Sequence, residues 1–334
     1  MKKSVLTLAA GAFMLAVAGP ASAQQPVKIR ISWAAIPAHL TPLIPQAPAG
    51  VYRHYGKSYV VETTRMAGSG PALQALAAGE LQLAGIGPQA LVLGVTRAQL
   101  ELRAVAQLMS QGVKGHPHTK FYGRKGEIKS VDELKGKIIA TNARGSTMDA
   151  AIRALMGQKG WREGRDYRMV EVGFGAMIAA IESKRIDVGP LLEPFNLLAD
   201  KKGDLAPVFD TQDVLGGTET LNYVATAAWA SKNRDVLTDF LEDHLRLRRW
   251  LLDPANRAAA IKILAETAKQ PVSAFEDWAF TTKGFYYAPD GLSDVKLLQK
   301  NIEDLKRLEV LPNVVDMAKY VDNSYVQAAL KRLQ

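Results

Sequence analysis

The segment at residues 136–156, GKIIATNARGSTMDAAIRALM, constrains the fold more than any other part of the sequence. Its first part, residues 137–141, is short, apolar and partly β-branched, which predicts a buried strand. Its last part, residues 149–156, is rich in Ala and contains no Pro or Gly, which predicts a helix. A strand followed closely by a helix is a building unit of α/β folds, so we expect helices packed on sheets.

The loop between this strand and helix has the composition of an anion site. Gly145 lets the backbone turn tightly, and Ser146 or Thr147 can cap the helix. The free N–H groups and the dipole at a helix start attract anions. Arg144 can add a bidentate grip on a carboxylate, sulfonate or phosphate. On this stretch alone, a capped helix with a solvated Arg144 is the simpler interpretation.

Three other segments place small or polar residues at the end of a predicted strand. They are residues 29–35, residues 63–70 ahead of a predicted helix at 71–78, and residues 170–175 ahead of a predicted helix at 176–183. Ligands in open α/β sheets bind outside the carboxyl ends of the strands. Four such joins therefore predict one shared cleft.

The first 23 residues have the pattern of a secretory signal peptide. Lys2 and Lys3 form a positive start, residues 5–18 are mostly apolar, and Ala21-Ser22-Ala23 is a small-residue cleavage site. The mature chain is expected to begin at Gln24. The sequence contains no cysteine, which excludes disulfides and a lipid anchor at the cut. A soluble protein in the periplasm of a Gram-negative bacterium fits these features best.

The formal net charge is +9, and +7 once Lys2 and Lys3 are removed. The basic residues are scattered, apart from Arg246-Leu247-Arg248-Arg249, which lies in a helical pattern and is expected to form a solvated face. Export argues against a nucleic-acid partner, whereas a mild positive field steers small anions.

Two stretches are expected to carry the chain between two domains. Residues 110–118 are polar and contain two glycines and a proline, which indicates a crossing. The return crossing is expected at a strand predicted over residues 223–229. The predicted division places residues 24–114 and 222–334 in lobe 1, and residues 115–221 in lobe 2.

The C-terminal part is predicted to be helical and to pack on the first lobe. The predicted helices cover residues 237–252, 254–267, 274–280, 292–308 and 324–333. Near the other end, residues 34–50 contain four prolines, so this segment is expected to be an irregular loop or a broken helix.

Four motifs carry a family resemblance. The first is GELQLAGIG at residues 79–87, and the second is SVDELKGK at residues 130–137. The others are GST at residues 145–147 and AAIESKRIDV at residues 179–188, with Glu193-Pro194 beyond it. Together they resemble solute-binding proteins of bacterial ABC importers, nearest to the nitrate, sulfonate and taurine branch, which also includes thiamine-precursor binders.

Three features depart from the pattern of that family. Gln82 stands where Asp is commoner, and Ser183 stands where Gly is commoner. The proline-rich residues 36–48 replace the usual smooth helix after the first strand. These differences bear on the identity of the ligand more than on the fold.

The resemblance implies a two-lobed periplasmic-binding-protein fold of type II. Two hinge strands would join the α/β lobes, and closure would bury a ligand in the inter-lobe cleft and create the surface that a membrane permease reads. It implies a monomer that is not an enzyme and has no cofactor. The implied ligand-binding residues are Ser32, Trp33, Gly68, Ser69, Gly70, Gly87, Pro88, Arg144, Gly145, Ser146, Thr147, Gly173, Phe174, Glu193, Asn222 and Tyr223.

Several candidates have a second interpretation. Trp33 and Phe174 either stack on the ligand or pack in the core. Glu193 either accepts a hydrogen bond from the ligand or pairs with Arg144 between the lobes. His116 and His118 flank a proline with no third ligand nearby, so no metal site is expected.

The ligand class and two other functions stay open from the sequence. Sulfonates, carboxylates, aromatic acids and nitrate-like anions all suit helix N-termini, and Trp33 with the long segment at residues 36–48 favours an organic anion with an apolar or aromatic body. One alternative is an enzyme on the same fold, with lyase or pyrimidine-precursor chemistry, although neither a cysteine nor a zinc-protease motif is present. The other is a sensory partner of a membrane receptor.

Overall fold

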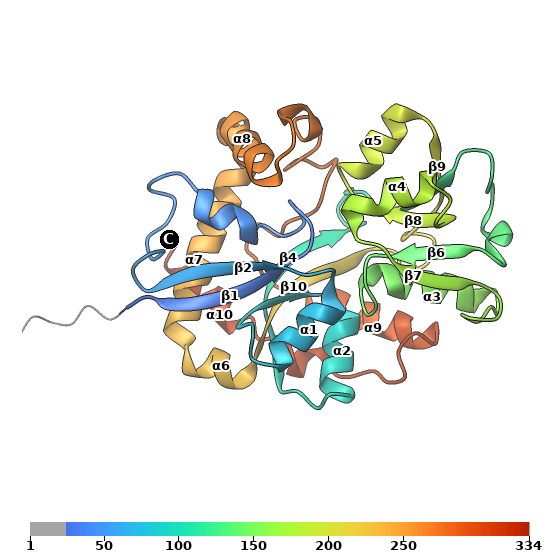
Figure 1. The fold of residues 1–334 in the computed structure, drawn as a ribbon. Coiled ribbons are helices and arrows are strands. Elements are labelled where there is room, and N and C mark those ends of the chain that lie inside the picture. Colours follow the sequence, from blue (N-terminus) through green and yellow to red (C-terminus); the bar gives the residue numbers. More distant parts are fainter. Residues whose placement is uncertain (1–24, 334) are drawn as a thin grey trace, which may run out of the picture.

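The computed structural model describes residues 25–333. The predicted signal peptide and the predicted mature terminus at Gln24 therefore lie outside the described residues. The described chain forms two α/β lobes that lie side by side, as predicted (Figure 1). Among the described residues, no helix is both long and apolar enough to cross a membrane.

The first lobe is built on two small sheets that continue into each other. Strand β1 (Val27–Trp33) pairs in parallel with β2 (Tyr59–Arg65). A parallel bridge between Ile31 and Leu83 joins β1 to the chain just before β3. The second sheet has the order β3-β10-β4 and is antiparallel, with bounds Ala84–Ile86, Thr218–Thr226 and Leu102–Gln111.

The second lobe contains one five-stranded sheet in the order β7-β6-β8-β5-β9. Its parallel part pairs β6 (Ile138–Thr141) with β7 (Arg168–Glu171), and β5 (Lys120–Arg124) is antiparallel to both of its neighbours. The remaining strands are β8 (Val188–Leu191) and β9 (Leu205–Asp210).

Helices follow the strands where the sequence predicts them. In the first lobe these are α1 (Ser69–Ala77) and α2 (Pro88–Thr96). In the second lobe they are α3 (Thr147–Gln158) and α4 (Met177–Glu182). A further helix, α5 (Phe195–Lys202), packs on β9, and neither of these two elements was predicted.

The C-terminal helices pack on the first lobe, as expected (Figure 1). Helix α10 lies against α7, and α9 lies against α2 and β10. Their bounds are Ala227–Lys232 for α6, Arg234–Leu252 for α7, Arg257–Ala268 for α8, Val295–Arg307 for α9 and Ser324–Lys331 for α10.

The prediction of a helix over residues 274–280 is wrong. Only a short 3-10 turn forms, at Val272–Ala274, and it follows Pro271. Phe280 has a φ of 58°, a left-handed conformation that no continuing helix accepts. Phe275 and Trp278 are buried nevertheless, so their apolar pattern reflects packing of an irregular segment.

The chain crosses between the lobes at residues 112–119 and 211–217, which link β4 to β5 and β9 to β10. These two segments run close together, because a Cβ added at Gly217 would lie 2.9 Å from the carbonyl oxygen of Gly112. Strand β10 begins at Thr218, earlier than the strand predicted at residue 223. It ends at Thr226, whose hydroxyl accepts a hydrogen bond from the Trp229 N–H and caps α6.

The prediction of a solvated basic face in α7 is wrong for Arg248. This side chain is fully buried, and its guanidinium donates to the carbonyl oxygens of Gln107 and Ala288, each at 2.6 Å. Burial lowers the pKa of Arg248 to about 10. Arg246 remains nearer the surface and pairs with Glu242 at 2.7 Å. The long arginine stem carries the guanidinium from α7 to β4, where carbonyl groups satisfy its charge.

Candidate functional site

A cavity lies between the lobes. Most of its walls come from residues at or just after the ends of β1, β2, β6, β7 and β8, together with residues of β3, β4 and β10. The four predicted strand-to-helix joins thus face one cavity, as expected. Apolar side chains and a few polar groups line it, which is the composition typical of small-molecule sites.

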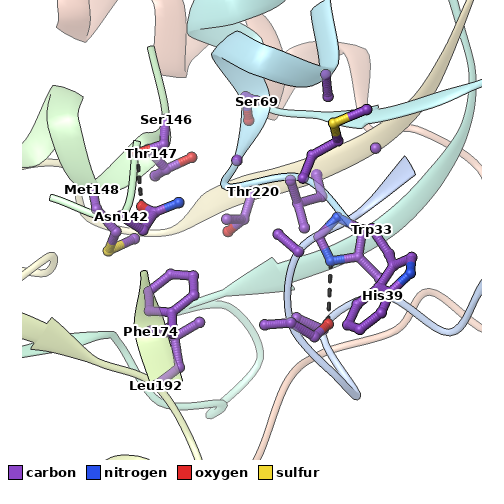
Figure 2. Close-up of a pocket in the computed structure, with 18 of the residues that line it drawn as sticks. Trp33, His39, Ser69, Asn142, Ser146, Thr147, Met148, Phe174, Leu192 and Thr220 are labelled. Atoms are coloured by element: carbon purple, nitrogen blue, oxygen red, sulfur yellow. Dashed lines mark hydrogen bonds between the residues drawn. The ribbon is translucent and has the colours of Figure 1, made fainter. Parts of the chain in front are cut away.

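The starts of two helices from different lobes meet at this cavity. Ser69 begins α1, and its hydroxyl accepts a hydrogen bond from the Gly87 N–H at 3.1 Å. Ser146 caps α3 by accepting from the Asp149 N–H at 3.2 Å, and it donates to the Asn142 side chain at 2.9 Å (Figure 2). Both serines are almost fully buried and line the cavity. The positive ends of two helix dipoles therefore act on the same space.

Two aromatic side chains stand on opposite sides of the cavity (Figure 2). Trp33 comes from the end of β1 in the first lobe, and Phe174 comes from the turn after β7 in the second. Both are partly buried, and Phe174 also packs against two separate hydrophobic clusters. Both rings can contact a flat or apolar group that enters the cavity.

None of the described residues that line the cavity is Asp, Glu, Lys or Arg. Much of the remaining wall is apolar and includes Met66, Met109, Met148 and Leu192. Burial holds His39 neutral by lowering its pKa to about 4. The electrostatics of the cavity therefore come from helix ends and neutral hydrogen-bonding groups.

Arg144 does not line the cavity. Its guanidinium donates to the Glu163 carboxylate at 2.8 Å and to the carbonyl oxygen of Met169 at 3.2 Å. Its side chain is 41% exposed, and the ion pair raises the pKa of Arg144 and lowers that of Glu163. The backbone N–H of Gly145 donates to Asp149 at 3.1 Å, so the loop is held by its own carboxylate neighbours.

The other predicted site residues fall into three groups. Ser32, Gly68 and Thr147 line the cavity together with Trp33, Ser69, Ser146 and Phe174. Gly70, Gly87, Pro88, Gly145 and Gly173 belong to the adjoining turns and helix starts but do not line it.

Glu193, Asn222 and Tyr223 form the third group and are buried away from the cavity. Glu193 accepts from the Asn196 amide at 2.9 Å and does not pair with Arg144. Asn222 accepts from the Ser293 hydroxyl at 2.7 Å, and Tyr223 shares a hydrogen bond of 3.0 Å with Thr41. Their observed contacts are structural.

The lobes touch beside the two helix starts. The Asn142 amide donates to the carbonyl oxygen of Ala67 at 2.9 Å, across the lobe boundary. A Cβ added at Gly70 would lie 2.3 Å from the carbonyl oxygen of Arg144. Glycine is thus required where the backbones of α1 and the 142–147 loop approach each other.

The sequence matches the model of the NMT1-like family over residues 22–265. The chain belongs to the NMT1-like family. No curated protein matches its sequence.

Solved structures share the fold of this NMT1-like protein at low sequence identity. The nitrate-binding protein NrtA from Synechocystis PCC 6803 matches with a TM-score of 0.72 at 17% identity, over 92% of this chain and 89% of that chain. The ligand-binding component of an ABC-type import system from Staphylococcus aureus, with zinc bound, matches with a TM-score of 0.70 at 19% identity. The match covers 92% of this chain and 99% of that chain. The alkanesulfonate-binding protein SsuA from Xanthomonas axonopodis pv. citri, bound to MOPS, matches with a TM-score of 0.67 at 17% identity. The match covers 89% of this chain and 99% of that chain.

An enzyme has the same fold. The desulfurization enzyme DSZB matches with a TM-score of 0.61 at 13% identity, over 92% of this chain and all of that chain. These likenesses show that the NMT1-like protein has the fold of periplasmic binding proteins, and that this fold alone does not exclude catalysis.

Several lining residues of this NMT1-like protein were missed by sequence reasoning: His39, Met66, Met109, Gln111, Asn142, Met148, Leu192, Thr220 and Leu221. The position of Asn142 directly after the predicted strand could have indicated that it lines the site. No local feature of the sequence indicated Gln111 and Thr220, since they come together only where β4 and β10 pair near the crossings.

No group of three or more potential metal ligands occurs within residues 25–333. The two histidines of the crossing segment make other contacts. His116 bonds to the carbonyl oxygen of Gly284 at 2.9 Å through Nδ1, and Nδ1 of His118 lies 3.4 Å from the Thr211 hydroxyl. Both side chains therefore help to hold the crossing segments in place.

Proposed function

We propose that this NMT1-like protein is the substrate-binding component of an ABC importer. It captures a small organic anion, a sulfonate or carboxylate with an apolar or aromatic body, in the periplasm and delivers it to a membrane permease. The observation that carries this proposal is the meeting of the α1 and α3 starts at one cavity between the lobes. The shared fold of the nitrate- and sulfonate-binding proteins supports it.

The proposed binding mode follows from the walls of the cavity. The acidic oxygens of the ligand accept from the free N–H groups at the helix starts and from the hydroxyls of Ser69 and Thr147. The body of the ligand lies between Trp33 and Phe174. Because none of the described lining residues is charged, the cavity favours an acidic group that carries a single charge spread over several oxygens.

Arg144 then acts on binding indirectly. Its ion pair with Glu163 holds the 142–147 loop, so that Asn142, Ser146 and Thr147 face the cavity. This role replaces the direct grip on the anion that the sequence suggested.

Catalysis is the second candidate, because the fold is shared with an enzyme and His39 is a neutral base in the cavity. Proton transfer needs a group whose pKa suits the operating pH, and a His39 pKa of about 4 makes it a weak base at neutral pH. Binding without turnover is therefore the better-supported function.

Native mass spectrometry of protein prepared from the periplasm tests the proposal, followed by calorimetric titration of the ligand that it identifies. The Thr147→Val variant should lose about 1 kcal/mol of binding free energy, because a ligand hydrogen bond is removed at nearly constant shape. Thr96→Val is the matched control, since this hydroxyl bonds to Val92 within α2, away from the cavity.

Three outcomes would contradict the proposal. One is a neutral or cationic ligand, such as a thiamine precursor. The second is conversion of the ligand by the pure protein, which would favour the enzyme alternative. The third is an equal loss of affinity in Thr147→Val and Thr96→Val.

A further inference from the structure

A second hollow, here called the outer groove, adjoins the cavity at the mouth of the cleft. Residues from both lobes line it, among them Trp33, Arg65, Phe174, Leu198, Lys269 and Phe275. Trp33 and Phe174 line both the cavity and the outer groove. The two aromatic side chains are thus a wall shared by an inner and an outer compartment.

The two compartments differ in charge. Among the described residues that line the cavity, the neutral His39 is the only acidic or basic one. The charged side chains of the outer groove are Arg65 and Lys269, both positive, and none of the described residues that line it is acidic. The outer groove is therefore the cationic part of the cleft.

Arg65 is well placed to receive a ligand group. Its guanidinium lies over the Trp33 ring, with Cζ 5.4 Å from the ring centre. Neither Arg65 nor Lys269 forms an ion pair with an acidic side chain within residues 25–333. A planar guanidinium stacked on an aromatic ring keeps its N–H edge free for a carboxylate or sulfonate.

We propose that the ligand has two acidic ends, one in the cavity and one in the outer groove. The inference rests on the proposed function, in which the first acidic group lies at the starts of α1 and α3. The apolar body passes between Trp33 and Phe174, and the second acidic group meets Arg65 and Lys269. The ligand class is thus an elongated dicarboxylate or sulfocarboxylate.

The chemistry of the walls favours this class over a one-ended anion. An apolar tail that reached the outer groove would leave two cations without a role in binding. A second acidic group gains charge-assisted hydrogen bonds there, and it loses little hydration because Arg65 and Lys269 are exposed. Two separated sites for acidic groups also fix the length of the ligand.

Calorimetric titration with matched probes tests the proposal. The diacids are adipate, suberate and sebacate, and the monoacids of equal length are hexanoate, octanoate and decanoate. We expect at least one diacid to bind about fivefold more tightly than its monoacid, the gain of one partly exposed ion pair. Arg65→Gln should lower diacid affinity more than monoacid affinity and so remove this advantage, and Lys269→Gln should reduce it.

Arg97→Gln is the matched control. Arg97 is an exposed arginine just after α2, and it lines neither the cavity nor the outer groove. This variant loses the same charge and should keep the diacid advantage. Melting of each unliganded variant verifies that the fold is retained.

The outcomes separate this inference from the proposed function. Equal binding of diacids and monoacids would overturn the outer subsite and leave the proposed function standing. A diacid advantage that survives in both Arg65→Gln and Lys269→Gln would also overturn it. If no probe binds, both the two-ended ligand and capture of a carboxylate in the cavity are contradicted.

Discussion

Arg144 and Glu163 form an ion pair outside the cavity, with guanidinium and carboxylate atoms 2.8 Å apart. Arg153 shares the same carboxylate at 3.0 Å and also pairs with Asp149 in the first turn of α3. This network links residue 163 to the loop at residues 142–147 and to the start of α3. Ion pairs outside the cavity thus hold the loop that contributes to its wall.

The first prediction concerns Arg144→Ala. We expect the free energy of unfolding of the unliganded protein to fall by about 0.5–1 kcal/mol, because a partly exposed ion pair is lost. Ligand affinity should fall less than in Thr147→Val. Chemical denaturation and calorimetry measure the two effects. A double-mutant cycle with Glu163→Gln should show coupling, and its absence would contradict the proposed bracing role.

The second prediction concerns closure of the lobes. Gly70→Ala should weaken ligand binding, because the added Cβ would lie 2.3 Å from the carbonyl oxygen of Arg144 in the other lobe. Small-angle scattering at saturating ligand should show a larger radius of gyration than for the wild type. Gly157→Ala is the control, since its nearest atom is 3.5 Å away. Normal affinity and compaction of Gly70→Ala would show that this contact is not needed for closure.

The third prediction is a dependence of stability on pH that arises from Glu219 in β10. Burial raises the pKa of this carboxyl from 4.5 to about 8. Between these values the unfolded chain releases the proton and the folded chain keeps it, so stability falls as pH rises from 4.5 to 8. The loss is on the order of a few kcal/mol. In Glu219→Gln this decline should be absent when unfolding is measured across that range, and an unchanged decline would rule out Glu219 as its source.

The fourth prediction has the opposite sign and concerns His39. Burial lowers its pKa from 6.5 to about 4, so the unfolded chain binds more protons than the folded chain between these values. Stability should fall as pH decreases through this window, by on the order of a few kcal/mol. Denaturant unfolding should show a smaller decline for His39→Gln. A chemical shift titration of His39 near 6.5 would disprove the neutral assignment.

Local patterns were enough to predict most of the fold. The strand and helix on either side of residues 142–147 follow from composition and from glycine and proline positions, and so do those around Ser69. The apolar pattern of the sequence led to wrong predictions where tertiary packing overrides local preference. The apolar residues Phe275 and Trp278 fill the core from an irregular segment, and the buried Arg248 donates to carbonyl groups of β4 and of Ala288.

The candidate site was predicted less completely, for a physical reason. A sequence indicates which residues follow a strand, and this placed Trp33, Ser146 and Phe174 correctly at the cavity. It does not indicate where a long side chain turns, so the partner of Arg144 could not be foreseen. Nor does it give the pairing of β4 with β10, which brings Gln111 and Thr220 to the wall.

A crystal structure of the protein with the ligand that it retains from the periplasm would show whether an anion binds at the two helix starts. We predict an organic anion in the cavity, with acidic oxygens within hydrogen-bond distance of the starts of α1 and α3 and its body between Trp33 and Phe174. A ligand without an acidic group there, or one bound outside the cavity, would rule out this binding mode.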